Sequence, residues 1–242
     1  MGEDVNARGE VDAATRRDWL WLIAATVGFG LGFGVYSGLL ANFLPQQLGL
    51  GRQQLGQIEA LREVPGLLIA GIVGLLAWLP EPRLAVVGLL LAGTGVGLLG
   101  RAEGFASAAL FQVINSIGLH LWLTVHPAIT MALLPKGRQG YGLGLVGAYQ
   151  SAALLSGLAA VFLLGDRLSF TTGFAAAGSV MALGGLCAAR VPPHRGGGLQ
   201  RRLLFRPKYG LYYALMVLDG GRRQLIVAFN TFILVNEFGA SK

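Results

Sequence analysis

The sequence predicts an all-α protein, a polytopic helical membrane protein, and three observations support this. Of the 242 residues, 54% are apolar and only 13% are charged, whereas soluble domains carry roughly 25% charged residues. The apolar residues fall into seven segments, each near the about 20 residues that a helix needs to cross a bilayer. Lysines and arginines collect between these segments rather than along one face. The expected location is therefore the cell inner (cytoplasmic) membrane, crossed several times.

The chain begins with a polar tail, residues 1–17, that contains four acids and three arginines but no apolar core. Such a segment is not a signal peptide. The predicted spans that follow cover residues 19–44, 54–79, 84–100, 105–134, 140–164, 168–189 and 209–236. Prolines, which break helices, follow the second, fourth and sixth spans. They are Pro80 and Pro82, Pro135, and Pro192 and Pro193.

The basic residues predict which way the chain points. With the N-terminus in the cytoplasm, twelve Lys and Arg residues fall inside, and only Arg52, Arg101, Arg167 and Lys242 fall outside. Cytoplasmic loops of membrane proteins carry an excess of positive residues. The asymmetry therefore predicts a cytoplasmic N-terminus.

One loop differs from the others. Residues 191–208 read VPPHRGGGLQRRLLFRPK, a basic linker that we expect to separate a six-helix bundle, 18–190, from a second membrane unit, 209–242. Its charges fit a contact with anionic lipid, at about 1 kcal/mol per basic residue near the surface. They equally fit a signal that only sets the topology.

Six spans, a basic linker and a seventh span resemble the first part of a bacterial major facilitator superfamily transporter. The first two helices of that family are similar to YSGLLANFLPQQLGLGRQQLGQIEALREVPGLL, its fourth and fifth helices to SIGLHLWLTVHPAITMALLPKGRQGYGLG, and the start of its seventh to RPKYGLYYALMVLDGGRRQ. The chain departs from the family in having only LPEPRL between the second and third spans and no Gly-Pro motif in the fifth. These departures argue against drug efflux.

The resemblance implies a six-helix bundle plus a seventh helix, out of a family fold of twelve. It also implies secondary active transport of a small solute by alternating access. The chain then looks truncated after the first helix of the second half, and the missing C-terminal half is an expected partner in the full-length form.

The second predicted span carries Glu59, Arg62 and Glu63, whose spacing of three and four residues lets opposite charges pair. One interpretation is a self-neutralised cluster near the membrane surface, with Arg62 extending outward. The other is a gate or coupling site, because two acids and one base leave a carboxylate that can titrate. We expect the functional role, with protons as the coupling ion.

Several uncharged polar groups and histidines also lie within apolar spans. His120, in a helix that borders the central cavity of the resembled fold, suits proton coupling or a hydrogen bond to a neighbouring helix. His126, which precedes Pro127, is expected to cap backbone groups freed at a kink. The remaining candidates, each for contact with either substrate or another helix, are Tyr36, Asn42, Asn115, Tyr149 and Gln150.

The seventh span, within LMVLDGGRRQLIVAFN, places Arg222 and Arg223 among apolar residues. Burying such a charge in hydrocarbon costs from about 2.5 kcal/mol upward, and Asp219 neutralises only part of it. In the resembled fold this helix lines the cavity, so one arginine is expected to attract an anionic group of the substrate. The alternative is an ion pair with the missing half.

Small residues four apart let helix backbones approach closely in membranes. This spacing relates Gly30, Gly34 and Gly38 in the first span, and Gly140 and Gly144 in the fifth. The run GLGLVG at 142–147 also fits a dinucleotide-binding pattern, but no strand precedes it. We therefore expect helix packing here.

Other function classes are disfavoured. The single cysteine, Cys187, leaves no disulfide or cysteine metal cage, and the histidines lack further ligands, so neither metal nor cofactor is expected. We expect no enzyme, because no nucleophile lies beside a base, and no nucleic-acid partner. The expected partners are membrane lipid and a small-molecule substrate. A non-transporting fragment and a seven-span receptor or sensor remain the alternatives.

Overall fold

The computed structural model describes residues 13–76, 78–134, 137–193, 207–212, 214, 215 and 218, and these form helices and turns without any strand. The prediction of an all-α chain is thus confirmed. The chain divides into two units between Arg201 and Arg202, within the predicted linker 191–208. The long helices are α1 (Ala13–Asn42), α2 (Arg52–Leu75), α3 (Glu81–Leu99), α4 (Phe105–Ala132), α5 (Gln139–Leu164) and α6 (Phe170–Ala188), with short turns η1 (Phe43–Gln47), η2 (Gly165–Arg167) and η3 (Pro207–Tyr209).

Five of these helices are long and apolar enough to cross a membrane, namely α1 with η1, α3, α4, α5 and α6. They indicate a multi-pass membrane protein. The predicted span 54–79 does form a helix, α2. It is not among the five, because three charged residues, Glu59, Arg62 and Glu63, lie within any part of it long enough to cross a membrane. Its apolar residues are concentrated after Glu63. The predicted seventh span, 209–236, lies mainly outside the described residues, although those described from 210 onward are helical.

Local chemistry accounts for the helix ends. The first helix begins at Ala13, inside the predicted tail 1–17, because the alanines and arginines there favour helix. Pro80 precedes the first turn of α3, where its fixed φ is suitable. At the start of α6 the Ser169 hydroxyl accepts a hydrogen bond from the Thr172 N–H at 3.1 Å. The turn between α4 and α5 uses Gly137 at a φ of 92°, which favours glycine.

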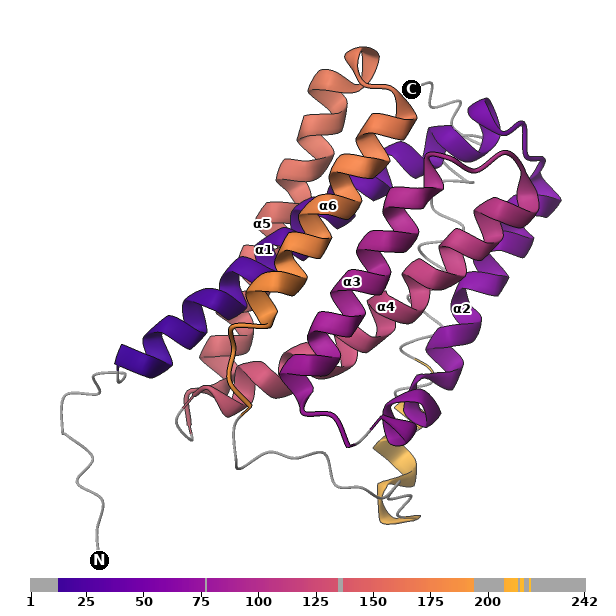
Figure 1. Cartoon of the computed structure of the whole chain (residues 1–242). Helices are drawn as coiled ribbons and strands as arrows, with labels where there is room; N and C mark the ends of the chain where they lie inside the picture. The colour runs from indigo at the N-terminus through magenta and orange to yellow at the C-terminus, as the bar shows by residue number, and fades with distance from the viewer. Residues whose placement is uncertain are drawn as a thin grey trace, which may run out of the picture. The chain divides into compact units, whose positions relative to one another are not determined.

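The six helices of the first unit pack as two related sets of three. Neighbours follow the order α5, α1, α6, α3, α4, α2 across the bundle (Figure 1). Exchanging α1 with α4, α2 with α5 and α3 with α6 gives the same order of neighbours, read from the other edge of the bundle. Because Tyr36 and Phe29 of α1 contact Gln112 and Trp122 of α4 respectively, the two exchanged helices run in opposite directions. The main helix contacts therefore follow the order of an inverted repeat of three helices.

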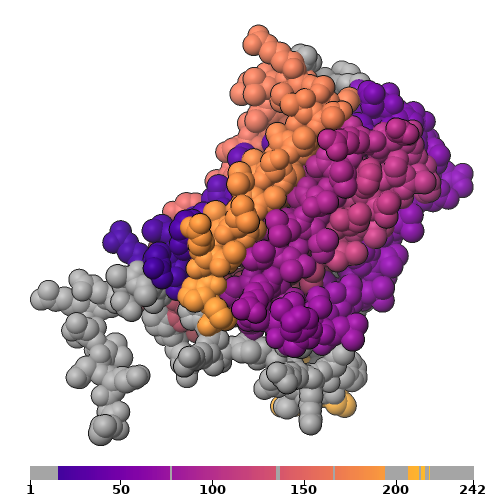
Figure 2. All heavy atoms as spheres, viewed as in Figure 1, coloured from indigo at the N-terminus to yellow at the C-terminus, as the bar shows by residue number. Residues whose placement is uncertain are grey.

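Glycines allow the closest approaches in this bundle. A Cβ atom placed at Gly30, Gly34 or Gly38 would lie within 3.1 Å of α5, and at Gly30 and Gly34 the obstacle is a backbone carbonyl of α5. The expected packing role thus fits these three glycines. Helices α3 and α6 approach in the same way at Gly93 and Gly178, and Figure 2 shows α6 lying directly against α3.

The predicted packing of Gly140 and Gly144 is wrong for the described part of the chain. A Cβ atom at either glycine would meet nothing within 4 Å. The face of α5 that is buried instead carries Val146, Ala153 and Gly157. Small residues recur on both faces of α5, so their spacing alone does not identify the face that meets α1.

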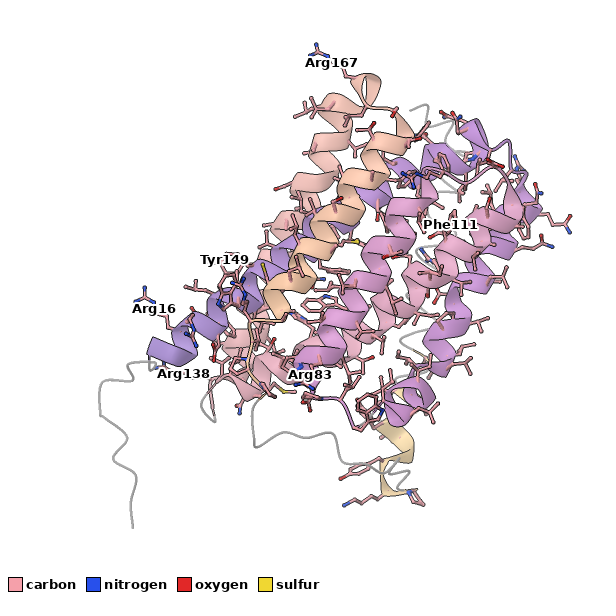
Figure 3. All side chains as sticks on the ribbon, in the orientation of Figure 1. Arg16, Arg83, Phe111, Arg138, Tyr149 and Arg167 are labelled. Atoms are coloured by element: carbon pink, nitrogen blue, oxygen red, sulfur yellow. The ribbon has the colours of Figure 1, made fainter. Side chains whose placement is uncertain are left out.

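Four arginines lie at the two ends of the bundle. Arg16, Arg83 and Arg138 lie at one end, and Arg167 lies at the other (Figure 3). The first three are the arginines that the sequence assigns to the cytoplasm, and Arg167 is one that it assigns to the outside. The fold is thus compatible with the predicted sidedness.

Candidate functional site

The candidate site begins with the charged triad of α2, Glu59, Arg62 and Glu63. An Nη2 atom of Arg62 lies 2.8 Å from Glu59 Oε2 and 3.2 Å from Glu63 Oε1. The Arg62 side chain is 16% exposed, whereas those of Glu59 and Glu63 are 39% and 37% exposed. Arg62 therefore turns into the bundle, and the interpretation in which it extends outward is wrong. One carboxylate remains unbalanced by positive charge within the triad.

Tyr36 connects this triad to two further helices. Its hydroxyl donates a hydrogen bond of 2.8 Å to Gln112 Oε1, and both residues are only 1% exposed. The Arg62 side chain lies near the same hydroxyl. A buried polar cluster thus joins α1, α2 and α4.

A row of polar side chains on α4 also belongs to the candidate site. Gln112, Ser116 and His120 follow one another at four-residue spacing, which places them on one face of the helix. The Ser116 hydroxyl donates a hydrogen bond to the backbone carbonyl of Arg62. The Nδ1 atom of His120 lies 2.9 Å from the Ser116 carbonyl and 3.1 Å from the Ser116 hydroxyl. His120 thus hydrogen bonds within its own helix, and its ring faces Gly66 of α2.

The cluster also contains buried amide groups that find no hydrogen-bond partner among the described residues. These are the Nε2 atom of Gln112 and both amide atoms of Asn115, a residue that is 1% exposed. Gln112 and Asn115 are three residues apart and so are neighbours on α4. An unpaired polar atom inside a protein costs about 1–3 kcal/mol. Such atoms are uncommon, and a functional role is one reason for them.

A second polar contact crosses between α1 and α4. His126 Nε2 lies 3.1 Å from the Thr26 hydroxyl, and the His126 ring packs against Trp122 with 4.5 Å between ring centroids. The expectation that His126 caps backbone groups near Pro127 is therefore wrong. The Thr130 hydroxyl donates to the His126 carbonyl at 2.9 Å, four residues earlier in the same helix.

The structure brings together only some of the residues proposed from the sequence. Those in or beside the polar cluster are Tyr36, Glu59, Arg62, Glu63, Asn115 and His120. Asn42 is not among them, since it accepts a bond of 3.2 Å from Gln46 near the end of α1. Tyr149, which is 42% exposed, and Gln150 lie on α5, at the opposite edge of the bundle from α2 (Figure 3).

Asp219, Arg222 and Arg223 lie outside the described residues. The anion-binding role of these arginines therefore stays a prediction.

Sequence reasoning missed Gln112, Ser116 and Thr26. The four-residue spacing of Gln112, Ser116, His120 and Thr124 was an available signal, because polar residues at that spacing share a helix face. Thr26 offered no comparable pattern. It is identified only by its contact with His126, 100 residues away.

Two further features of the described residues bear on the site. No group of three His, Cys, Asp or Glu side chains within them could hold a metal ion. A pocket of about 250 Å³ lies between η1, the turn that follows α3, and the start of α6. Its lining residues, none of which belongs to the polar cluster, are Phe43, Gln47, Gly100, Ala102, Leu168, Ser169, Phe170 and Thr171.

Comparison of the chain with protein-family models, with curated proteins and with solved structures finds no match.

Proposed function

We propose that this chain is a secondary active transporter of the major facilitator type, which moves a small polar solute across the cell inner membrane by alternating access. The observation that carries the proposal is the order of helix contacts, which is that of an inverted repeat of three helices. Many secondary transporters are built from such repeats, and they bind solute near the middle of the membrane where the repeats meet. The polar cluster spans α1 and α4, the first helix of each repeat.

The chemistry of the cluster suits a polar solute. Gln112 and Asn115 hold unpaired amide groups that can donate and accept hydrogen bonds. Polar and charged groups within membrane segments are costly and commonly mark substrate or ion pathways. The preference for an anionic group rests on Arg222 or Arg223 and remains part of the proposal.

Proton coupling is the second part of the proposal. The triad has one more carboxylate than it has cations, and both carboxylates are more exposed than Arg62. A carboxylate that gains and loses a proton would change how strongly it holds Arg62. Since the Arg62 side chain lies near Tyr36, which bonds Gln112 of α4, such a change would be felt where α1 meets α4.

Uptake into proteoliposomes tests the proposal. We expect at least one labelled solute from a panel of organic acids, amino acids and sugars to enter vesicles that contain the chain, faster under an inward proton gradient. Glu59→Gln should remove the effect of the gradient, whereas Glu103→Gln, at an exposed loop residue, should not. Uptake that is indifferent to the gradient excludes the coupling. Uptake no greater than in empty vesicles, for every solute, favours a fragment that does not transport.

A further inference from the structure

The helix α2 is held in the bundle differently from its counterpart in the repeat. Both helices lie at an edge of the bundle, with three of 24 residues buried in α2 and four of 26 in α5. The substantial packing of α2 within the described residues is against α4 alone. The counterpart, α5, packs on α1 through glycines that bring backbones together. Less contact holds α2 in place.

The middle of α2 is also its weakest stretch. Pro65 has no N–H group, so the Leu61 carbonyl receives no bond from that position. Gly66 follows at once, and glycine within a helix costs about 1 kcal/mol relative to alanine. A helix bends most readily where its own hydrogen bonds are interrupted.

Two side chains of α4 contact α2 at this stretch. The Ser116 hydroxyl donates to the Arg62 carbonyl, one turn before Gly66. The His120 ring lies over Gly66 so closely that a Cβ atom there would be 2.5 Å from His120 Nε2. The bonds from His120 Nδ1 to Ser116, described above, hold the ring in that orientation.

We propose that Ser116 and His120 form a clip that holds α2 against α4 at Pro65 and Gly66, and that α2 swings away from the bundle when the clip opens. The clip consists of a hydrogen bond and a fit against glycine, not of an interdigitated apolar core. A hydrogen bond contributes little net free energy and so can break and reform. This inference goes beyond the transport proposal, because it concerns which helix moves and requires no substrate.

Spin labels can follow this movement. We place one label at Leu75, at the end of α2, and one at Leu183 on α6, both exposed positions, after Cys187→Ser. Distances between the labels are measured by double electron–electron resonance in lipid nanodiscs. The starting protein should show one dominant distance. In Gly66→Ala, the ratio of open to closed populations should rise about tenfold, the factor that corresponds to losing about one hydrogen bond.

The matched control is Gly71→Ala, five residues further along α2, where a Cβ atom would meet nothing within 4 Å in the described part of the chain. It should leave the distances unchanged. Ser116→Ala removes only the hydroxyl oxygen and should shift the populations in the same direction as Gly66→Ala. If Gly66→Ala fails to fold, Ser116→Ala alone still tests whether the clip holds α2 in place.

The double variant separates a clip from general destabilisation. If Gly66 and His120 act on each other, then Gly66→Ala combined with His120→Ala should open α2 no further than His120→Ala alone. Effects that add would overturn the proposal. So would a distance distribution in Ser116→Ala, or in folded Gly66→Ala, that matches Gly71→Ala. Because no solute is involved, this result does not depend on whether the chain transports.

Discussion

Replacing Gly34 with alanine should destabilise the bundle although alanine is the better helix former. The added Cβ atom would overlap the carbonyl oxygen of Leu154 and lie 3.1 Å from the Gly157 Cα atom, both on α5. These are backbone atoms, so the clash is relieved only if α1 and α5 move apart. Overpacking of this kind costs about 1–3 kcal/mol.

The gain in helix propensity offsets part of that cost. Glycine to alanine within a helix is worth roughly 0.5–1 kcal/mol. The net destabilisation expected for Gly34→Ala is therefore up to about 2.5 kcal/mol, with a central value of about 1 kcal/mol. For chains of this size, each kcal/mol shifts the melting temperature by about 2–4 °C, so we expect a decrease of several degrees in detergent.

The control for this prediction is Gly144→Ala on α5, where the same gain applies and no atom of the described residues lies within 4 Å of the added carbon. It should melt at or slightly above the parent temperature. A Gly34→Ala protein that melts as high as the parent would refute the packing of α1 on α5. Equal destabilisation by both substitutions would show instead that the exposed face of α5 is covered.

Three further predictions concern the polar contacts and the topology. Tyr36→Phe removes the hydroxyl that bonds Gln112, which should cost about 1 kcal/mol and lower the melting temperature. The control Tyr149→Phe, at an exposed position, should leave the melting temperature unchanged. Equal shifts in the two variants would contradict the buried contact. Thr26→Val removes the hydrogen-bond partner of the buried His126 ring and should lower the free energy of unfolding by about 1–3 kcal/mol. The same melting assay measures this, and an unchanged melting temperature would argue against that bond. Reporter fusions should place residue 137 in the cytoplasm and residue 102 outside, and the reverse result would disprove the predicted orientation.

Much of the fold could be predicted because the relevant signals are local. The length of each apolar run and the positions of Pro80 and Ser169 lie within a few residues of the helix ends that they explain. The candidate site was harder. Glu59, Arg62 and Glu63 could be paired from their spacing on one helix, but that spacing did not show that Arg62 turns inward, since this depends on where the other helices pack.

Hydrophobic length and helix-breaking residues act over a few turns, so the helical character of the chain and its segments that can cross a membrane follow from the order of its amino acids. Tertiary structure alone decided which faces meet: that Gly34 packs and Gly144 does not, and that Ser116 reaches the Arg62 carbonyl 54 residues away. The physical reason is that a polar or small residue in a helix requires or allows a close neighbour, without specifying which helix provides it. Only the packing of all six helices supplies that answer.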